Sequence, residues 1–141
     1  MKFFLCNSYM TPLYAAVNKG NIPIIKLLLE NDKIDVNYLN NQHRNSQIIK
    51  KTALYLAVEK GKVEIVKLLI TNKNIDVNIV NENIEYEIVE DEDGYPAQEE
   101  YNRGISALQL AKEKGNTEII NLLQSVDNTK IINLLQENGN N

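Results

Sequence analysis

Apolar residues near the start of the chain follow a helical spacing in two successive stretches. Leu13, Ala16 and Val17 stand at positions i, i+3 and i+4, which lie on one face of a helix. Thr11, just before this stretch, is a good N-cap, and Gly20 favours the left-handed conformation that ends a helix. The stretch that follows Gly20 is richer in apolar residues. The pattern therefore predicts two short helices with a turn at Gly20.

The same pattern occurs three times. Residues 11–37 and 52–78 align without a gap and are identical at 16 of 27 positions, and residues 106–128 match the second copy at 12 of 23 positions. Helices this short are marginal alone in water, so the units must stack to cover one another. We expect one position of the second helix to form a single stacked layer of leucines: Leu27, Leu68 and Leu122.

The marks that recur in each unit point to a known family. The segments Thr11–Ala16, Ile25–Leu29 and Asp35–Asn37, with Gly20 between the first two, resemble the ankyrin repeat. The resemblance extends over three units and covers nearly all of residues 11–128. It implies an all-α fold, a solenoid of stacked helix pairs with projecting β-hairpin loops. It also implies a role in binding other proteins.

The sequence departs from the family pattern in two features. Ankyrin repeats carry a histidine after Thr-Pro-Leu that bonds to the threonine hydroxyl, and here that place holds Tyr14, Tyr55 and Gln109. The usual threonine-to-histidine bond is therefore not expected. The glycine that precedes the Ala-Asp-Val-Asn segment of the family is also absent, so we expect a looser turn there.

Long inserts of opposite charge separate the units. Residues 38–51 hold three basic and no acidic residues, and residues 79–102 hold nine acidic and no basic residues. Alternation at Ile84–Ile88 predicts a half-buried strand, and Asp91–Gly94 predicts a turn, so we expect an enlarged hairpin over residues 79–105. Three interpretations of its charge stay open: a solvated loop, a contact for a basic partner, or pairing with the basic insert.

The C-terminal part of the chain repeats half a unit. Residues 116–124 recur as residues 128–136 with eight of nine positions identical. In one continuous helix this offset of 12 would rotate the second apolar stripe by about 120°, so we expect a break at Asp127–Asn128 and a last helix that folds back as a cap. The alternative is a dimer seam at Ile131, Leu134 and Leu135. At the other end, only Phe3, Phe4 and Leu5 are available to cover the first unit.

We expect a single ankyrin-type domain, because the repeats and inserts follow one another over 141 residues. Its expected parts are an N-terminal cap (1–10), repeat 1 (11–37), a basic insert (38–51), repeat 2 (52–78), an acidic hairpin (79–105), repeat 3 (106–127) and a C-terminal capping helix with a tail (128–141).

The chain offers little to catalysis. It has one cysteine, Cys6, and one histidine, His43, and it has no P-loop, G-x-S-x-G or C-x-x-C motif. Residues 91–100 follow most of the EF-hand spacing, but Val89 would hold the first ligand position, so we expect an acidic turn rather than a calcium site. We therefore expect no enzyme activity, no cofactor and no metal.

Charge and hydropathy narrow the partner class. The net charge is -4 and the sequence pI about 5.1, which argues against nucleic acid. No apolar run approaches the roughly 20 residues that cross a bilayer, and no motif indicates a small-molecule substrate. The single cysteine excludes an intrachain disulfide and favours an intracellular, cytoplasmic location, with the nucleus left open.

The repeated frame with variable exposed residues predicts a non-catalytic module that binds a partner protein through hairpin tips and the concave face of the first helices. The alternative is a self-associating structural protein that uses its weakly capped ends, as a monomer or weak homodimer. The candidate partner-binding residues stand before the first helices, on them and at their ends: Met10, Tyr14, Asn18, Lys19, Lys51, Tyr55, Glu59, Lys60, Ile105, Gln109, Glu113 and Lys114.

Overall fold

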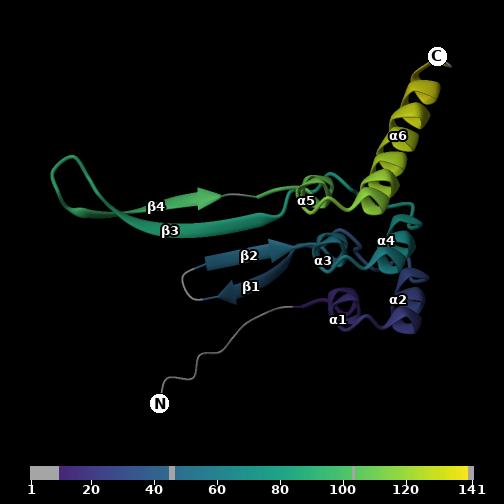
Figure 1. The fold of residues 1–141 in the computed structure, drawn as a ribbon, viewed down its shortest axis with the longest axis horizontal. Coiled ribbons are helices and arrows are strands. Elements are labelled where there is room, and N and C mark those ends of the chain that lie inside the picture. Colours follow the sequence, from purple (N-terminus) through teal and green to yellow (C-terminus); the bar gives the residue numbers. More distant parts are fainter. Residues whose placement is uncertain (1–9, 45–46, 103, 140–141) are drawn as a thin grey trace.

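The computed structural model describes residues 10–44, 47–102 and 104–139. Three helix pairs lie in a stack, and a four-stranded sheet projects from one side of it (Figure 1). The inner helices, next to the sheet, are α1 (Pro12–Lys19), α3 (Ala53–Glu59) and α5 (Ala107–Glu113). The outer helices are α2 (Ile22–Leu29), α4 (Val63–Ile70) and α6 (Thr117–Gly139).

The inner helices begin and end where the sequence predicts. Each N-cap hydroxyl accepts a backbone hydrogen bond three residues ahead, at 3.3 Å from Tyr14 N to Thr11, 3.1 Å from Tyr55 N to Thr52 and 3.2 Å from Gln109 N to Ser106. Gly20 ends α1 with φ 71°, which a residue with a Cβ adopts only with strain. This confirms the predicted turn between the two helices of the unit.

A shared apolar core runs through the stack, but not at all the positions expected. Ile25, Val66 and Leu69 are fully buried, as are Ile119 and Leu123 in the third unit. The expected layer of Leu27, Leu68 and Leu122 is wrong at its first member: Leu68 and Leu122 are partly buried against the core, whereas Leu27 is 66% exposed. The first unit has no described unit before it, so its corresponding face stays open.

The inserts form one antiparallel sheet rather than separate loops. Strands β1 (Asn40–Arg44), β2 (Gln47–Lys51), β3 (Glu82–Glu90) and β4 (Pro96–Asn102) lie in sequence order. The fold is therefore not purely all-α, because the two hairpins pair with each other through β2 and β3, with Lys50 opposite Glu82. The predicted strand and turn of the acidic hairpin are confirmed in β3 and at residues 92–94.

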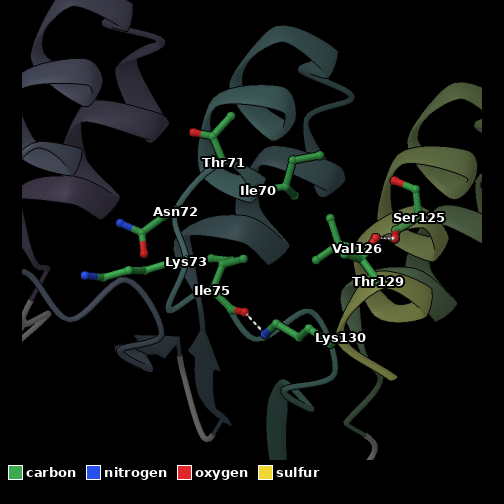
Figure 2. Close-up of a pocket in the computed structure, with 9 residues that line it drawn as sticks. All are labelled: Ile70, Thr71, Asn72, Lys73, Ile75, Ser125, Val126, Thr129 and Lys130. Atoms are coloured by element: carbon green, nitrogen blue, oxygen red, sulfur yellow. Dashed lines mark hydrogen bonds between the residues drawn. The ribbon is translucent and has the colours of Figure 1, made fainter. Parts of the chain in front are cut away.

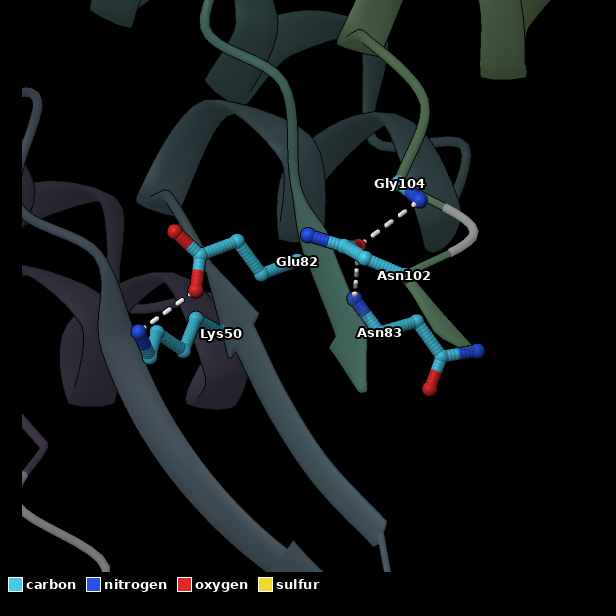
Figure 3. A network of polar contacts seen from close by, with 5 residues as sticks. All are labelled: Lys50, Glu82, Asn83, Asn102 and Gly104. Atoms are coloured by element: carbon cyan, nitrogen blue, oxygen red, sulfur yellow. Dashed lines mark hydrogen bonds and ion pairs between the residues drawn. The ribbon is translucent and has the colours of Figure 1, made fainter. Parts of the chain in front are cut away.

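The two hairpins are also joined by side chains. Lys50 Nζ lies 2.5 Å from Glu82 Oε2, and Gln47 Nε2 donates to Glu85 Oε1 at 3.0 Å. Asn102 Oδ1 accepts from the backbone N–H groups of Asn83 and Gly104, which holds the end of β4 beside the start of β3 (Figure 3). Internal pairing of the acidic and basic inserts, one of the three open interpretations, is confirmed at the Lys50–Glu82 and Gln47–Glu85 contacts.

The expected break at Asp127–Asn128 is wrong, and so is a separate capping helix over 128–141. α6 is continuous for 23 residues and extends beyond the stack (Figure 1). The segment holds neither glycine nor proline between its first residue and Glu137, and an aspartate or asparagine costs a helix less than about 1 kcal/mol. The side chain of Thr129 also bonds within the helix, at 2.8 Å to the carbonyl of Ser125. The expected cover by Phe3, Phe4 and Leu5 lies outside the described residues.

Candidate functional site

The ends of the inner helices present polar side chains to solvent in every unit. Asn18 and Lys19, Lys60, and Glu113 and Lys114 are exposed, and Glu59 is half-buried. Lys60 Nζ donates to the backbone carbonyl of Asn18 at 3.1 Å, which joins the ends of α1 and α3. The stacking thus brings these predicted residues together along one side of the molecule. We define them as the inner-helix surface.

The two tyrosines among the candidate partner-binding residues are buried. Tyr14 is fully buried, and its hydroxyl oxygen accepts from Gln42 Nε2 of β1 at 3.0 Å. Tyr55 is 7% exposed. A tyrosine is long enough to reach from the inner helix toward the strands, so at the histidine position of the repeat it fills the junction between helix and sheet. Contact with a partner through Tyr14 is therefore excluded in this structure.

Tyr55 lies in a charged environment between the second and third units. Burial raises the pKa of its phenol, and the negative charges of Glu59 and Glu113 raise it further. Lys51 Nζ lies 2.6 Å from Glu59 Oε1 and 5.7 Å from the centre of the Tyr55 ring. The phenol therefore stays protonated at neutral pH, and the charges around it are those of the half-buried Glu59 and Lys51 and the exposed Glu113.

Of the three residues expected at hairpin tips, Lys51 and Ile105 lie at hairpin bases and Met10 lies just before α1. Lys51 pairs with Asn40 at the opposite end of the hairpin from the Arg44–Gln47 pair. Met10 is 45% exposed just before α1, and Ile105 is half-buried, with its carbonyl accepting from Asn81 N at 3.0 Å. The inserts lengthen the strands to as many as nine residues, about 30 Å, so the tips lie far from the inner helices. Gln109, in contrast, is exposed on α5 as expected.

The tip of the acidic hairpin carries apolar residues that the sequence analysis did not select. Ile88 is 80% exposed and Tyr95 is 69% exposed, next to the exposed acidic run Glu90–Asp93. Pairing between β2 and β3 ends at Glu85, so the outer part of β3 has β4 alone beside it among the described residues. Alternation alone predicts a half-buried Ile88, because it does not show where the neighbouring strand ends.

Asn40 is a positioning residue that the sequence analysis missed. It is 1% exposed, and its Oδ1 accepts from Thr11 N at 2.7 Å. Its Nδ2 donates to the carbonyls of Tyr38 at 3.0 Å and Lys51 at 3.3 Å. One side chain thus fixes the start of α1 and both strands of the first hairpin. The signal was present: extending the alignment of the first two units by three residues places Asn81 at the equivalent position.

Comparison with known proteins identifies the family of the stacked helix pairs. A family model described as ankyrin repeats in three copies matches residues 1–81. The chain belongs to the ankyrin repeat family. The matched region includes the first two units, and the third is joined to it by its sequence identity with the second and by the stacked pair α5–α6.

A crystal structure of an ankyrin repeat domain from Acinetobacter baumannii AYE is similar to this chain, with 23% sequence identity and a TM-score of 0.44. The alignment covers 86% of this chain and 66% of that domain. This ankyrin chain therefore spans less than two thirds of the length of its structural relative. The search of curated proteins found no match.

One cleft of about 350 Å³ is lined by residues 61–65 together with Gly20 and Ile22. Another cleft lies where α6 leaves the ankyrin stack (Figure 2). Ile70 to Lys73 and Ile75 line one side, and Ser125, Val126, Thr129 and Lys130 of α6 line the other. Its volume of about 220 Å³ is below the roughly 300–1,000 Å³ of ordinary ligand pockets. Across the described residues there is no cluster of three or more side chains suited to hold a metal ion.

No helix within the described part of this ankyrin chain combines the length and the apolar character needed to span a bilayer. α6 is the longest, and charged or amide side chains interrupt its apolar residues throughout.

Proposed function

We propose that this chain is a non-catalytic protein-interaction module that binds its partner protein through the inner-helix surface and the projecting hairpins. The observation that carries the proposal is the row of exposed polar side chains that the stacked units repeat. Caps, glycines and core residues recur at fixed positions, and the ends of α1, α3 and α5 each present an exposed lysine beside Asn18, Glu59 or Glu113.

The polar side chains of the inner-helix surface suit a partner with acidic and hydrogen-bonding groups. Lys19, Lys60 and Lys114 occupy equivalent positions in their units, so stacking repeats a positive charge along this surface. Glu59 and Glu113 lie beside these lysines. A partner must therefore place acidic groups at the lysines and basic groups at the glutamates. Charge complementarity of this kind contributes mainly to specificity and association rate.

The burial of Tyr14 and Tyr55 changes which residues carry the interaction. The apolar anchors that strengthen protein interfaces must then come from elsewhere. Among the described residues, Met10 at the entry to α1 and Ile88 and Tyr95 at the acidic hairpin are exposed apolar groups that could serve as such anchors.

The proposal is tested by affinity purification from native lysate at low salt with matched charge variants. Lys19→Glu/Lys114→Glu reverses two charges on the inner-helix surface, and Lys26→Glu/Lys73→Glu reverses two exposed charges on the outer side. We expect partners retained by the natural chain to be lost with the inner pair and kept with the outer pair. Equal recovery with both pairs would place the interaction elsewhere.

A further inference from the structure

The C-terminal half of α6 exposes an apolar stripe away from the stack. Four residues form it and are 49–67% exposed: Ile131, Ile132, Leu134 and Leu135. We call them the α6 stripe. The same six-residue sequence occurs earlier in the helix, where Ile119 and Leu123 are fully buried against the stack. A sequence that packs as core in its first copy is thus left in solvent in its second.

Contacts at the base hold the α6 stripe in a fixed direction. Asn78 Nδ2 donates to Asp127 Oδ1 at 2.9 Å, and Lys130 Nζ donates to the carbonyl of Ile75 (Figure 2). Both bonds come from the loop after α4, so the second unit orients the helix just before the stripe begins. The stripe is therefore presented on a rigid helix, which lowers the entropy cost of docking.

The α6 stripe continues onto an incompletely covered edge of the third unit. Ile120 is half-buried and precedes Ile131 by eleven residues, about three helical turns, so both lie on one face to within about 20°. On the inner helices, Leu54 is 1% exposed in the second unit, whereas its counterpart Leu108 in the third is half-buried. The edge and the stripe thus form one apolar surface.

The charges of this segment indicate what covers the surface. Lys130 and Glu137 are the charged residues of the segment 128–139, and they lie seven residues apart on the same flank of the stripe. If two copies of the segment lie antiparallel about a two-fold axis near Asn133, each Lys130 comes to the level of a Glu137 of the other copy. The Lys130 ammonium keeps its bond to the carbonyl of Ile75 and has further N–H donors for this carboxylate. A parallel pair would place like charges at the same level. The antiparallel arrangement also brings the two stripes into register.

We propose that the projecting half of α6 is a self-association surface on which the same segment of a second copy of this chain docks antiparallel. The interface is isologous, so it closes as a dimer. About three turns of helix per copy bury less than the roughly 1,200 Å² of stable complexes, so the dimer is weak. This association goes beyond the partner-binding function and leaves the inner-helix surface free.

Sedimentation velocity of the full chain from 10 μM to 1 mM tests the proposal. We expect a concentration-dependent dimer for the natural chain and a monomer for Leu134→Glu, with unchanged circular dichroism. Glu137→Lys and Lys130→Glu each place like charges together and weaken the dimer about tenfold. Lys130→Glu also loses the bond to the carbonyl of Ile75, and recovery of the dimer in a mixture of the two variants separates the charge effect from that loss. Mixing these two variants pairs opposite charges at both contacts, so the mixture dimerises again. Glu92→Lys, the same charge change at the hairpin tip, is the matched control and leaves the dimer intact.

Three results would overturn the proposal. The first is a natural chain that stays monomeric at 1 mM, and the second is a dimer that Leu134→Glu leaves unchanged. The third is a mixture of the two charge variants that associates no better than either variant alone. The last result would contradict the antiparallel orientation in particular. None of these measurements depends on a partner protein, so failure here is separate from failure of the partner-binding function.

Discussion

The two halves of α6 contain the same six-residue sequence, but one copy is packed against the stack and the other is exposed to solvent. Ile119–Gln124 and Ile131–Gln136 are identical, yet Leu123 is fully buried while Leu135 is 67% exposed. The first half has α4 and α5 beside it, and the second half extends past them (Figure 1). Burial in a repeat protein is thus decided by whether a neighbouring unit is present, because each unit covers only the next one.

The same contrast separates the stacked helix pairs, which we call the frame, from the two hairpins and the second half of α6, which project from it. In the frame, caps, glycines and buried aliphatic residues recur with the repeat. In the projections, β3 continues beyond its pairing with β2, and α6 continues beyond the third unit. Mutations in the frame should therefore change stability, while similar mutations in the projections should change association and leave stability nearly intact.

The largest expected effect comes from the paired leucines of α6. Leu123→Ala opens a cavity in the core and should lower the free energy of unfolding by about 2–5 kcal/mol. Leu135→Ala removes an exposed side chain and should cost less than about 0.5 kcal/mol. Urea unfolding followed by circular dichroism at low micromolar concentration, where α6 association is negligible, measures both. Equal losses would mean that the second half of α6 packs as the first half does.

Asn40 tests the junction between the frame and the sheet. Asn40→Ala leaves the N–H of Thr11 and the carbonyls of Tyr38 and Lys51 without this partner in a largely buried place. We expect a loss of about 1–3 kcal/mol in the free energy of unfolding. Asn41→Ala, on the neighbouring half-buried residue, is the control and should cost less than about 0.5 kcal/mol. A loss of the same size in both would assign the effect to the strand rather than to the hydrogen bonds.

The frame was largely predictable from the sequence because it repeats. Thr11 and Gly20 mark a helix by local chemistry that needs no knowledge of neighbours, and the structure has both in those roles. The predictions that failed concern residues whose burial depends on neighbouring helices and strands. Tyr14 was a candidate anchor because its position lies near the concave surface of the repeat, but β1 and Gln42 cover it.

The predicted break in α6 failed for a related reason. The need to bury Ile131 and Leu135 favoured a turn at Asp127–Asn128, but neither residue ends a helix strongly. Bonds from the loop after α4 hold the helix straight through this point, at Asp127 and Lys130. Those bonds join residues about fifty positions apart, so a local pattern does not contain them.

An N-cap offers a smaller change, within the frame. Asn21 and Asn116 cap α2 and α6 with bonds of 3.2 Å to the backbone N–H groups of Ile24 and Ile119, whereas Lys62 before α4 makes no such bond. Lys62→Asn supplies the missing acceptor and should raise the free energy of unfolding by about 0.5–1 kcal/mol. Thermal and urea unfolding measure the gain. Lys62→Ala is the control, since it removes the same charge without adding a cap, and a gain of equal size there would contradict the capping explanation.

The smallest expected effect, absent at neutral pH, concerns the phenol of Tyr55. Burial, followed by the charges of Glu59 and Glu113, raises its pKa above the ordinary 10.0. Below pH 10 the phenol is protonated in both the folded and the unfolded chain, so it adds no pH dependence. As the pH rises above 10 the unfolded chain loses the proton first, and the free energy of unfolding falls until the folded phenol ionises as well.

Tyr55→Phe isolates this contribution, because phenylalanine keeps the ring and has no proton to lose. We expect urea midpoints of the natural chain and the variant to stay close at pH 8 and to diverge above pH 10, where the natural chain loses more stability. Tyr38→Phe, at a tyrosine that is 43% exposed, controls for the loss of a hydroxyl group. Parallel declines in the natural chain and Tyr55→Phe would mean that the phenol ionises as readily in the folded chain as in the unfolded one. Tyr55 would then belong with the solvated projections and not with the buried frame.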